Sequence, residues 1–134
     1  LTVQGSWSNN GVFIADTNST VAFSPVIDST IGGSNTFYNL ACTNSARTLF
    51  FQAGRTNTVM GKLSLRSPTL MSTSTGVWYY LRLDAGATHE VSRVTVQDAN
   101  SAGGPRIEAS SSRDLGNNVN WFITSPRGTQ VLIR

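Results

Sequence analysis

The sequence predicts an all-β fold, which we expect to be a short right-handed parallel β-helix (β-solenoid), with an antiparallel β-sandwich as the alternative. A repeated phrase supports the solenoid, because Asn35–Thr43 recurs as Asn57–Leu65 about 22 residues later. A period of roughly 20 residues fits one coil of a solenoid, whereas one hairpin of a sandwich is usually shorter. Composition supports the all-β class, since only 13% of the residues are charged and Ser, Thr and Asn make up about a third of the chain. Such a chain has little material for exposed helices, while hydroxyl and amide groups suit turns and stacked ladders.

Both copies of the repeated phrase are predicted strands, because their side chains alternate with a period of two. The alternation places Phe37, Asn39 and Ala41 on one face and Tyr38, Leu40 and Cys42 on the other. Cys42 is the only cysteine, so no internal disulfide can form. We expect it to be a small buried residue, with an intermolecular disulfide as the alternative.

Length and charge limit the class of protein. A chain of 134 residues is expected to be a single all-β module, residues 1–134. The net charge of +3 comes from nine Arg and one Lys spread singly along the chain, so we expect no nucleic-acid partner. No stretch reaches the roughly 18 apolar residues of a membrane span, and no signal-peptide pattern is present. The composition is typical of secreted surface proteins, which predicts a mature or excised piece with an extracellular or cell-surface location.

The first half of the chain is predicted to alternate short strands and turns. Leu1–Gln4 is a predicted strand, and Asn10-Gly11 favours a tight reversal. Val12–Ala15 and Thr20–Phe23 are two further strands, which either pair as a hairpin or form successive sides of one coil. The same rhythm continues through residues 26–27, 30–31, 48–52 and 69–71.

The second half contains the most aromatic predicted strand, Val77–Asp84. Its alternation places Val77, Tyr79, Leu81 and Leu83 on one face and Trp78, Tyr80, Arg82 and Asp84 on an exposed face. Val91–Asp98 again carries an Arg in its middle and an Asp at its end, so we expect the two segments to stack. Residues 99–105 and 110–118 are predicted loops, and residues 106–109, 120–123 and 130–134 are predicted strands.

Four phrases relate the chain to known proteins, namely Gly5–Gly11, Ser19–Phe23, Ile31–Leu40, and Gly116–Asn118 with Asn120-Trp121. On these phrases the chain resembles repeat modules of large secreted and surface-exposed bacterial proteins of the adhesin and autotransporter type. Those modules are generally taken to form right-handed parallel β-helices. The resemblance covers most of the chain in the expected order and implies a scaffold or adhesion role, with no catalytic motif to transfer. The chain departs from the pattern in being a single unit instead of part of a long array.

A single solenoid module exposes apolar end coils unless they are capped or stacked on a neighbour. We therefore expect its partners to be other copies of itself or neighbouring repeats. These would pack end to end, or exchange strands, at the edges formed by Leu1–Gln4 and Gln130–Arg134. The predicted function is a structural subunit or module of an extracellular surface fibre or adhesin.

A carbohydrate-binding module is the first alternative function, with a cell-surface polysaccharide as the partner. The predicted ligand-binding residues are Trp78, Tyr80 and Trp121, with Trp7 as a further candidate. Flat rings beside amide and Arg side chains suit the face of a sugar, although each ring can instead cover the core.

A polysaccharide-degrading enzyme is the second alternative. Asp84 and Asp98 would approach each other if they fell on adjacent coils, as an acid and base require, and the remaining carboxylates considered are Glu108 and Asp114. An Asp at a strand end more simply caps a turn, and Arg82 and Arg93 stand near enough to neutralise the pair. We therefore expect no enzyme and no catalytic residue.

We also expect no metal and no cofactor. His89 is the only histidine, and no second histidine or thiolate stands at ligand spacing. The loops that begin at Asp98 and Asp114 offer oxygen ligands for calcium but match no complete calcium loop, so turn formation is the simpler interpretation.

Overall fold

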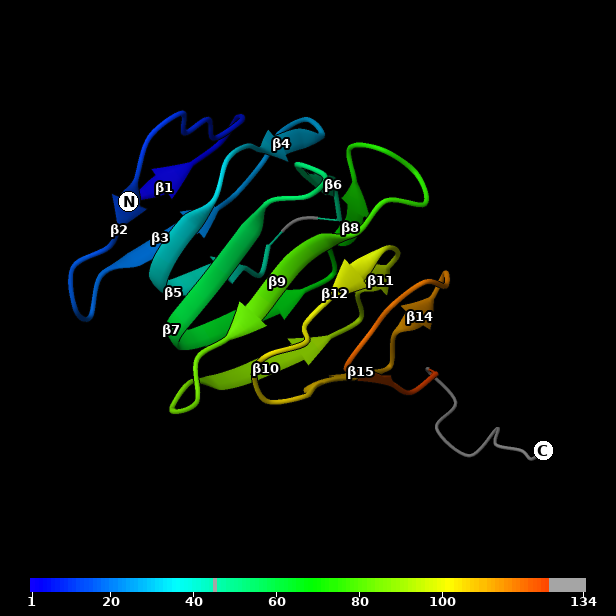
Figure 1. The fold of residues 1–134 in the computed structure, drawn as a ribbon. Helices are drawn as coiled ribbons and strands as arrows, with labels where there is room; N and C mark the ends of the chain where they lie inside the picture. The colour runs from blue at the N-terminus through cyan, green and yellow to red at the C-terminus, as the bar shows by residue number, and fades with distance from the viewer. Residues whose placement is uncertain (45, 126–134) are drawn as a thin grey trace.

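The structure is a computed structural model that describes residues 1–44 and 46–125. These residues form a right-handed parallel β-solenoid of about five turns without helices (Figure 1). All pairs among the described strands are parallel. The predicted β-helix is confirmed, and the antiparallel sandwich is excluded.

Short strands follow one another along the whole described chain. They are β1 (Thr2–Val3), β2 (Phe13–Ile14), β3 (Thr20–Phe23), β4 (Ser29–Ile31), β5 (Asn35–Cys42), β6 (Thr48–Phe51), β7 (Thr56–Arg66), β8 (Thr69–Ser72), β9 (Tyr79–Leu83), β10 (Thr88–Ser92), β11 (Thr95–Val96), β12 (Ala99–Asn100), β13 (Ile107–Ser110), β14 (Arg113–Asp114) and β15 (Trp121–Ile123).

Each coil visits three faces of the solenoid in the same order. The long face consists of β1, β3, the second half of β5, the second half of β7, β10, β13 and β15. The third face consists of β4, β6, β8, β11 and β14. The aromatic face consists of β2, the first halves of β5 and β7, β9 and β12. β5 and β7 therefore run without a break around the corner between the aromatic face and the long face.

The repeated phrase of the sequence marks two stacked coils, because Asn35 lies directly opposite Asn57. The predicted assignment of faces within the phrase is wrong. Phe37, Leu40 and Cys42 all point into the core, although simple alternation separates Phe37 from the other two. The strand turns a corner between Phe37 and Asn39, where its register with β7 shifts, and the shift exchanges the inward and outward positions.

Two predictions on the second half of the chain are also wrong. The segment Val91–Asp98 is not one strand, because Arg93 adopts a positive φ of 56° and turns the chain from β10 to β11. β10 stacks on β7 and β11 stacks on β8, while the strand stacked on β9 is β12. Val77 precedes β9 and is exposed instead of buried. β12 and β14 also fall in segments predicted as loops.

The N-terminal strands settle a choice that the sequence left open. β2 and β3 do not pair as a hairpin, because both lie parallel to β5, along its first and second halves. They are successive sides of the solenoid. The predicted strand Gln130–Arg134 lies outside the described residues.

Stacked apolar side chains fill the interior along the whole solenoid, from Val21 and Phe23 to Ile107 and Ala109. At the N-terminal end this core is closed by Trp7. Its ring contacts Phe13, Phe23 and Phe37, with ring centroids 4.9, 6.4 and 5.9 Å away. Trp7 therefore serves as an aromatic cap on the core, and we find no reason to keep it as a ligand-binding candidate.

A buried amide ladder runs along the corner between the third face and the aromatic face. Asn35 Oδ1 accepts hydrogen bonds from Trp7 Nε1 at 2.9 Å and from Asn9 Nδ2 at 3.0 Å. Asn35 Nδ2 donates to Asn57 Oδ1 at 2.8 Å. The ladder ends on the next coil, where Leu81 lies opposite Asn57. It links three successive coils and ties the Trp7 cap to them.

Candidate functional site

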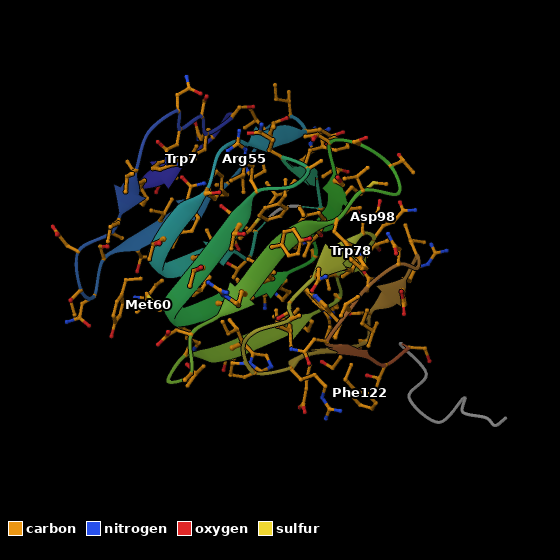
Figure 2. The ribbon with its side chains drawn as sticks, in the orientation of Figure 1. Trp7, Arg55, Met60, Trp78, Asp98 and Phe122 are labelled. Carbon is orange, nitrogen blue, oxygen red and sulfur yellow. The ribbon has the colours of Figure 1, made fainter. Side chains whose placement is uncertain are left out.

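Trp78 and Tyr80 border the same hollow on the aromatic face, Trp78 directly before β9 and Tyr80 within it. Trp78 is labelled in Figure 2. Between them Tyr79 points into the core, where its ring stacks on Phe51 at 4.8 Å. The outward pair borders a shallow hollow of about 410 Å³, which we call the aromatic hollow. Its lining residues are Gly54, Gly76, Val77, Trp78, Tyr80 and Asn117.

A chain of hydrogen bonds fixes the ring of Trp78. Its Nε1 donates to the backbone oxygen of Asn117 at 2.9 Å. The side chain of Asn117 in turn donates to Asp98 Oδ1 at 2.7 Å, and the backbone N–H of Gly76 donates to Asp98 Oδ2 at 2.9 Å. These residues lie on three successive coils, so the stacking of the solenoid itself holds the indole in place.

Two glycines leave the floor of the aromatic hollow bare. Gly54 and Gly76 adopt positive φ values of 77° and 85°, a conformation that glycine adopts without strain. A Cβ atom at either position would meet no heavy atom of the described residues within 4 Å. The backbone beside the Trp78 ring is therefore open to solvent.

Trp121, the third predicted ligand-binding residue, lies elsewhere. It belongs to β15 on the long face and is half-buried against the core. Its Nε1 is buried and has no hydrogen-bond partner among the described residues. The structure thus brings Trp78 and Tyr80 together and leaves Trp121 apart from them.

The four carboxylates considered for catalysis do not converge. Asp98 precedes β12, whose Ala99 lies opposite Tyr79, whereas Asp84 follows the other end of β9. Asp98 is buried, and both its oxygens accept hydrogen bonds. Glu108 pairs with Arg106 at 3.0 Å, and Asp114 accepts from Asn118 and from the backbone of Gly116. Each of these three carboxylates has a structural partner in the described chain.

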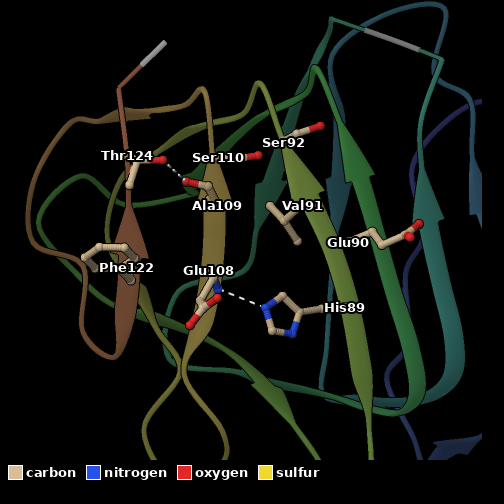
Figure 3. A pocket seen from close by; sticks show the side chains of 9 residues that line it. All are labelled: His89, Glu90, Val91, Ser92, Glu108, Ala109, Ser110, Phe122 and Thr124. Atoms are coloured by element: carbon tan, nitrogen blue, oxygen red, sulfur yellow. Dashed lines mark hydrogen bonds between the residues drawn. The ribbon is translucent and has the colours of Figure 1, made fainter. Parts of the chain in front are cut away.

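A second hollow crosses the outer surface of the long face. This lateral groove has a volume of about 410 Å³ and is lined by His89, Glu90, Val91, Ser92, Glu108, Ala109, Ser110, Phe122 and Thr124 (Figure 3). The His89 ring lies between β10 and β13, and its Nε2 accepts the backbone N–H of Glu108 at 3.0 Å. The histidine thereby satisfies a backbone donor where the two strands diverge.

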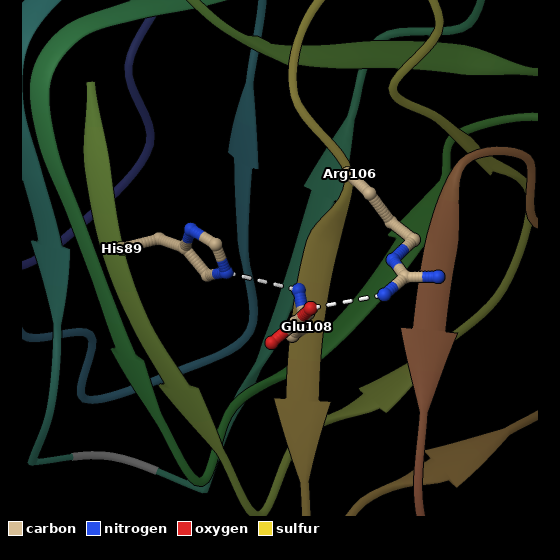
Figure 4. Close-up of polar contacts among 3 residues, drawn as sticks. All are labelled: His89, Arg106 and Glu108. Atoms are coloured by element: carbon tan, nitrogen blue, oxygen red, sulfur yellow. Dashed lines mark hydrogen bonds and ion pairs between the residues drawn. The ribbon is translucent and has the colours of Figure 1, made fainter. Parts of the chain in front are cut away.

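The charges around the lateral groove are paired. Figure 4 shows Arg106 bridging to Glu108, and the same guanidinium lies 4.8 Å from the centre of the Phe122 ring. Glu90 pairs with Lys62 at 3.1 Å. These pairs are exposed, so each contributes little stability. Among the described residues that line the groove, they leave no unpaired carboxylate to point to a ligand.

Sequence reasoning missed the lateral groove, although a repeat in the sequence marks it. Glu90-Val91-Ser92 recurs as Glu108-Ala109-Ser110 after 18 residues, and Val91 lies opposite Ala109 in the structure. The repeat is only three residues long and differs in spacing from the Asn35 repeat. Because the coils differ in length, the two repeats have different spacings, and the shorter one could not be recognised as a sign of stacked coils.

Burial shifts the pKa values of two side chains in the core. It raises the pKa of the Cys42 thiol to about 11, which keeps the thiol protonated and unreactive. Burial, followed by the nearby Asp98 carboxylate, raises the pKa of the Tyr79 phenol well above its usual value. Both side chains are buried in the core, and neither lines the aromatic hollow or the lateral groove.

The described residues hold no group of three or more His, Cys, Asp or Glu side chains that could bind a metal ion. Within the same residues, no helix has the length and apolar character needed to cross a membrane. Comparisons with models of known protein families, with curated proteins and with solved structures give no match for this chain.

Proposed function

We propose that this chain is a structural module of an extracellular surface fibre or adhesin, extended by stacking its N-terminal coil on further coils. The proposal rests on the unpaired edges of the first coil. Within the described residues, β1 and β2 of the first coil each pair along one edge only, β1 with β3 and β2 with β5. An open parallel edge is a template for another strand.

The free edge can be located atom by atom. The N–H of Ala15 donates to the oxygen of Thr36 at 2.9 Å, so the alternation of a parallel ladder directs both backbone groups of Ile14 away from β5. On the long face, the backbone oxygens of Leu1 and Val3 accept from the N–H groups of Ala22 and Ser24, each at 2.8 Å, which directs both backbone groups of Thr2 outward. Two strands of the end coil therefore offer donors and acceptors in the same direction.

An apolar rim accompanies this edge. Leu1, Val12 and Ile14 are 75%, 86% and 70% exposed. Apolar side chains gathered beside unpaired strand edges favour contact with another protein surface. A parallel continuation brings the opposite end of another copy, or a neighbouring repeat, onto this coil, and such head-to-tail contacts generate filaments.

The composition supports the extracellular setting of the proposal. Lys62 is the only lysine, and the polar surface is mainly Ser, Thr and Asn. Stacked parallel strands with a continuous core form a stiff rod, which suits a stalk or fibre. A carbohydrate-binding role is compatible with this function, because the aromatic hollow lies on a side face and not on the end coil.

The substitution Ile14→Pro tests the proposal. Proline removes the outward N–H of Ile14, which makes no bond to β5, so the fold is retained while the free edge loses a donor. Ile14→Thr is the matched control, because it keeps the N–H and the strand propensity. We expect the mass from light scattering to rise with concentration for the wild type and to rise far less for Ile14→Pro.

The exposed Met60 provides a second control. It is 40% exposed and belongs to β7, which pairs with β5 on one side and with β9 and β10 on the other, so it lies away from the end coil. Met60→Lys is expected to assemble like the wild type. A wild type that stays a 14.4 kDa monomer at every concentration contradicts self-assembly, as does equal assembly of Ile14→Pro and Ile14→Thr.

A further inference from the structure

The aromatic hollow has the properties of a preorganised binding surface. Trp78 remains 37% exposed although its Nε1 is bonded and its ring is held across three coils. Its backbone oxygen also accepts from Gly54 at 2.8 Å. A ligand that lies against this ring therefore requires little ordering of the protein on binding.

Hydrogen-bonding groups stand at the border of the hollow. Within the described residues, the Tyr80 hydroxyl makes no hydrogen bond, and the side-chain oxygen of Asn117 accepts none. The hollow thus combines a flat apolar ring with a donor and two acceptors at its border. A pyranose ring has the matching chemistry, an apolar face of C–H groups surrounded by hydroxyls.

The charges in and behind the aromatic hollow favour an uncharged sugar over an anionic one. None of the six lining residues carries a formal charge. Directly behind the lining, the buried Asp98 carboxylate receives hydrogen bonds from Gly76 and Asn117 and has no cationic partner among the described residues. A negative charge in this position disfavours anionic ligands and leaves uncharged sugars as the fitting class.

The open floor favours a polymer over a terminal sugar. Gly54 and Gly76 present bare backbone beside Trp78, and no side chain in the described part of the chain comes within 4 Å of either Cβ position. Tyr80 is two residues further along the same side of the extended chain, roughly 7 Å from Trp78. Successive rings of one chain therefore have room to lie over both aromatic side chains.

We propose that the aromatic hollow binds uncharged pyranose residues within a polysaccharide chain, which stack on Trp78 and Tyr80 and bond to the border groups. This binding does not depend on the proposed end-to-end assembly, because the hollow and the end coil share no residue. A module with both properties would hold a polysaccharide along the side of a rod.

The test is affinity electrophoresis of the wild type in gels containing soluble β-glucan, galactomannan or xylan, with alginate as the anionic polymer. Any polymer that retards the chain is then titrated while tryptophan fluorescence is followed. Trp78→Ala is expected to lower the affinity at least about tenfold, since it removes the stacking surface. Phe122→Ala is the matched control, because Phe122 is an exposed ring on the long face (Figure 2), and it should bind like the wild type.

Two milder variants keep the test valid if Trp78→Ala folds poorly. Trp78→Phe retains a ring and is expected to retain most of the affinity, whereas Tyr80→Ala is expected to lose several-fold because one of the two stacking rings is absent. No retardation by any neutral polymer overturns the proposal. Equal binding by wild type, Trp78→Ala and Tyr80→Ala, or stronger binding to alginate than to the neutral polymers, also overturns it.

Discussion

The buried amide ladder provides a quantitative prediction for the solenoid. In Asn35→Ala the ladder loses three short hydrogen bonds, those with Trp7 and Asn9 at 2.9 and 3.0 Å and that with Asn57 at 2.8 Å. The Asn35 side chain also loses two longer bonds to the backbone oxygens of Gly32 and Gly33, at 3.3 and 3.5 Å, which are too weak to change the estimate. At about 1 kcal/mol for each bond, the free energy of unfolding falls by about 3 kcal/mol. Asn57→Ala loses only the last of the three short bonds, because the Asn57 Nδ2 has no partner among the described residues, and the expected loss is about 1 kcal/mol.

The two substitutions should not be additive. The bond between Asn35 and Asn57 is removed by either one, so the double variant is expected to lose about 3 kcal/mol and not the sum of about 4. The assay is urea unfolding followed by far-ultraviolet circular dichroism, with the slope m compared among variants. Asn35→Ala with the distant Ser112→Ala is the control pair, which should add within about 0.5 kcal/mol.

Two results would refute this reasoning. If Asn35→Ala lowers the unfolding free energy by less than about 1 kcal/mol, the ladder is not a buried network that joins coils. If the Asn35 and Asn57 effects add within the error of the control pair, the two amides are not bonded to each other. Either result removes the physical basis for stacking these two coils in the observed register.

Two further predictions concern the corner and the core. Gly61→Ala should lower stability by about 1–3 kcal/mol in thermal unfolding, because its Cβ would lie 2.5 Å from Tyr38 Cε2, whereas Gly86→Ala, with open space, should be nearly neutral. Cys42 should react with thiol reagents only after unfolding, since a shift of its pKa from 9.0 to about 11 lowers the thiolate fraction roughly 100-fold near neutral pH. Because folding favours the protonated thiol, the contribution of Cys42 to the free energy of unfolding is complete below pH 9 and declines as the pH rises towards 11. The Cys42→Ala variant should lack this decline.

The fold was predictable because the two copies of the Asn35 repeat lie in consecutive coils at equivalent positions. Asn35 and Asn57 are 22 residues apart and stack directly, so the sequence period equals the coil period. Alternation failed where one strand continues around a corner, as at Phe37 and Asn39, since the sequence there contains no glycine or proline to signal the turn. It failed again at Arg93, whose positive φ turns the chain although arginine rarely adopts that conformation.

The candidate site was predictable in part. Trp78 and Tyr80 share an outward side because they are two residues apart in the extended segment that leads into β9, and that follows from local geometry alone. Asn117 joins them from a coil about 40 residues away, which local pattern cannot show because the coils differ in length. The separation of Asp84 from Asp98 has the same origin, since the strand that stacks on β9 is β12 and not Val91–Asp98.

Electron microscopy of the purified chain at high concentration tests the proposed function most directly. We expect filaments in which coils continue at about 4.8 Å across each junction, so that one chain of about five turns advances the filament by roughly 24 Å. The same preparation of Ile14→Pro should contain single particles. A wild type that shows only isolated particles of 14.4 kDa would contradict end-to-end stacking of the first coil.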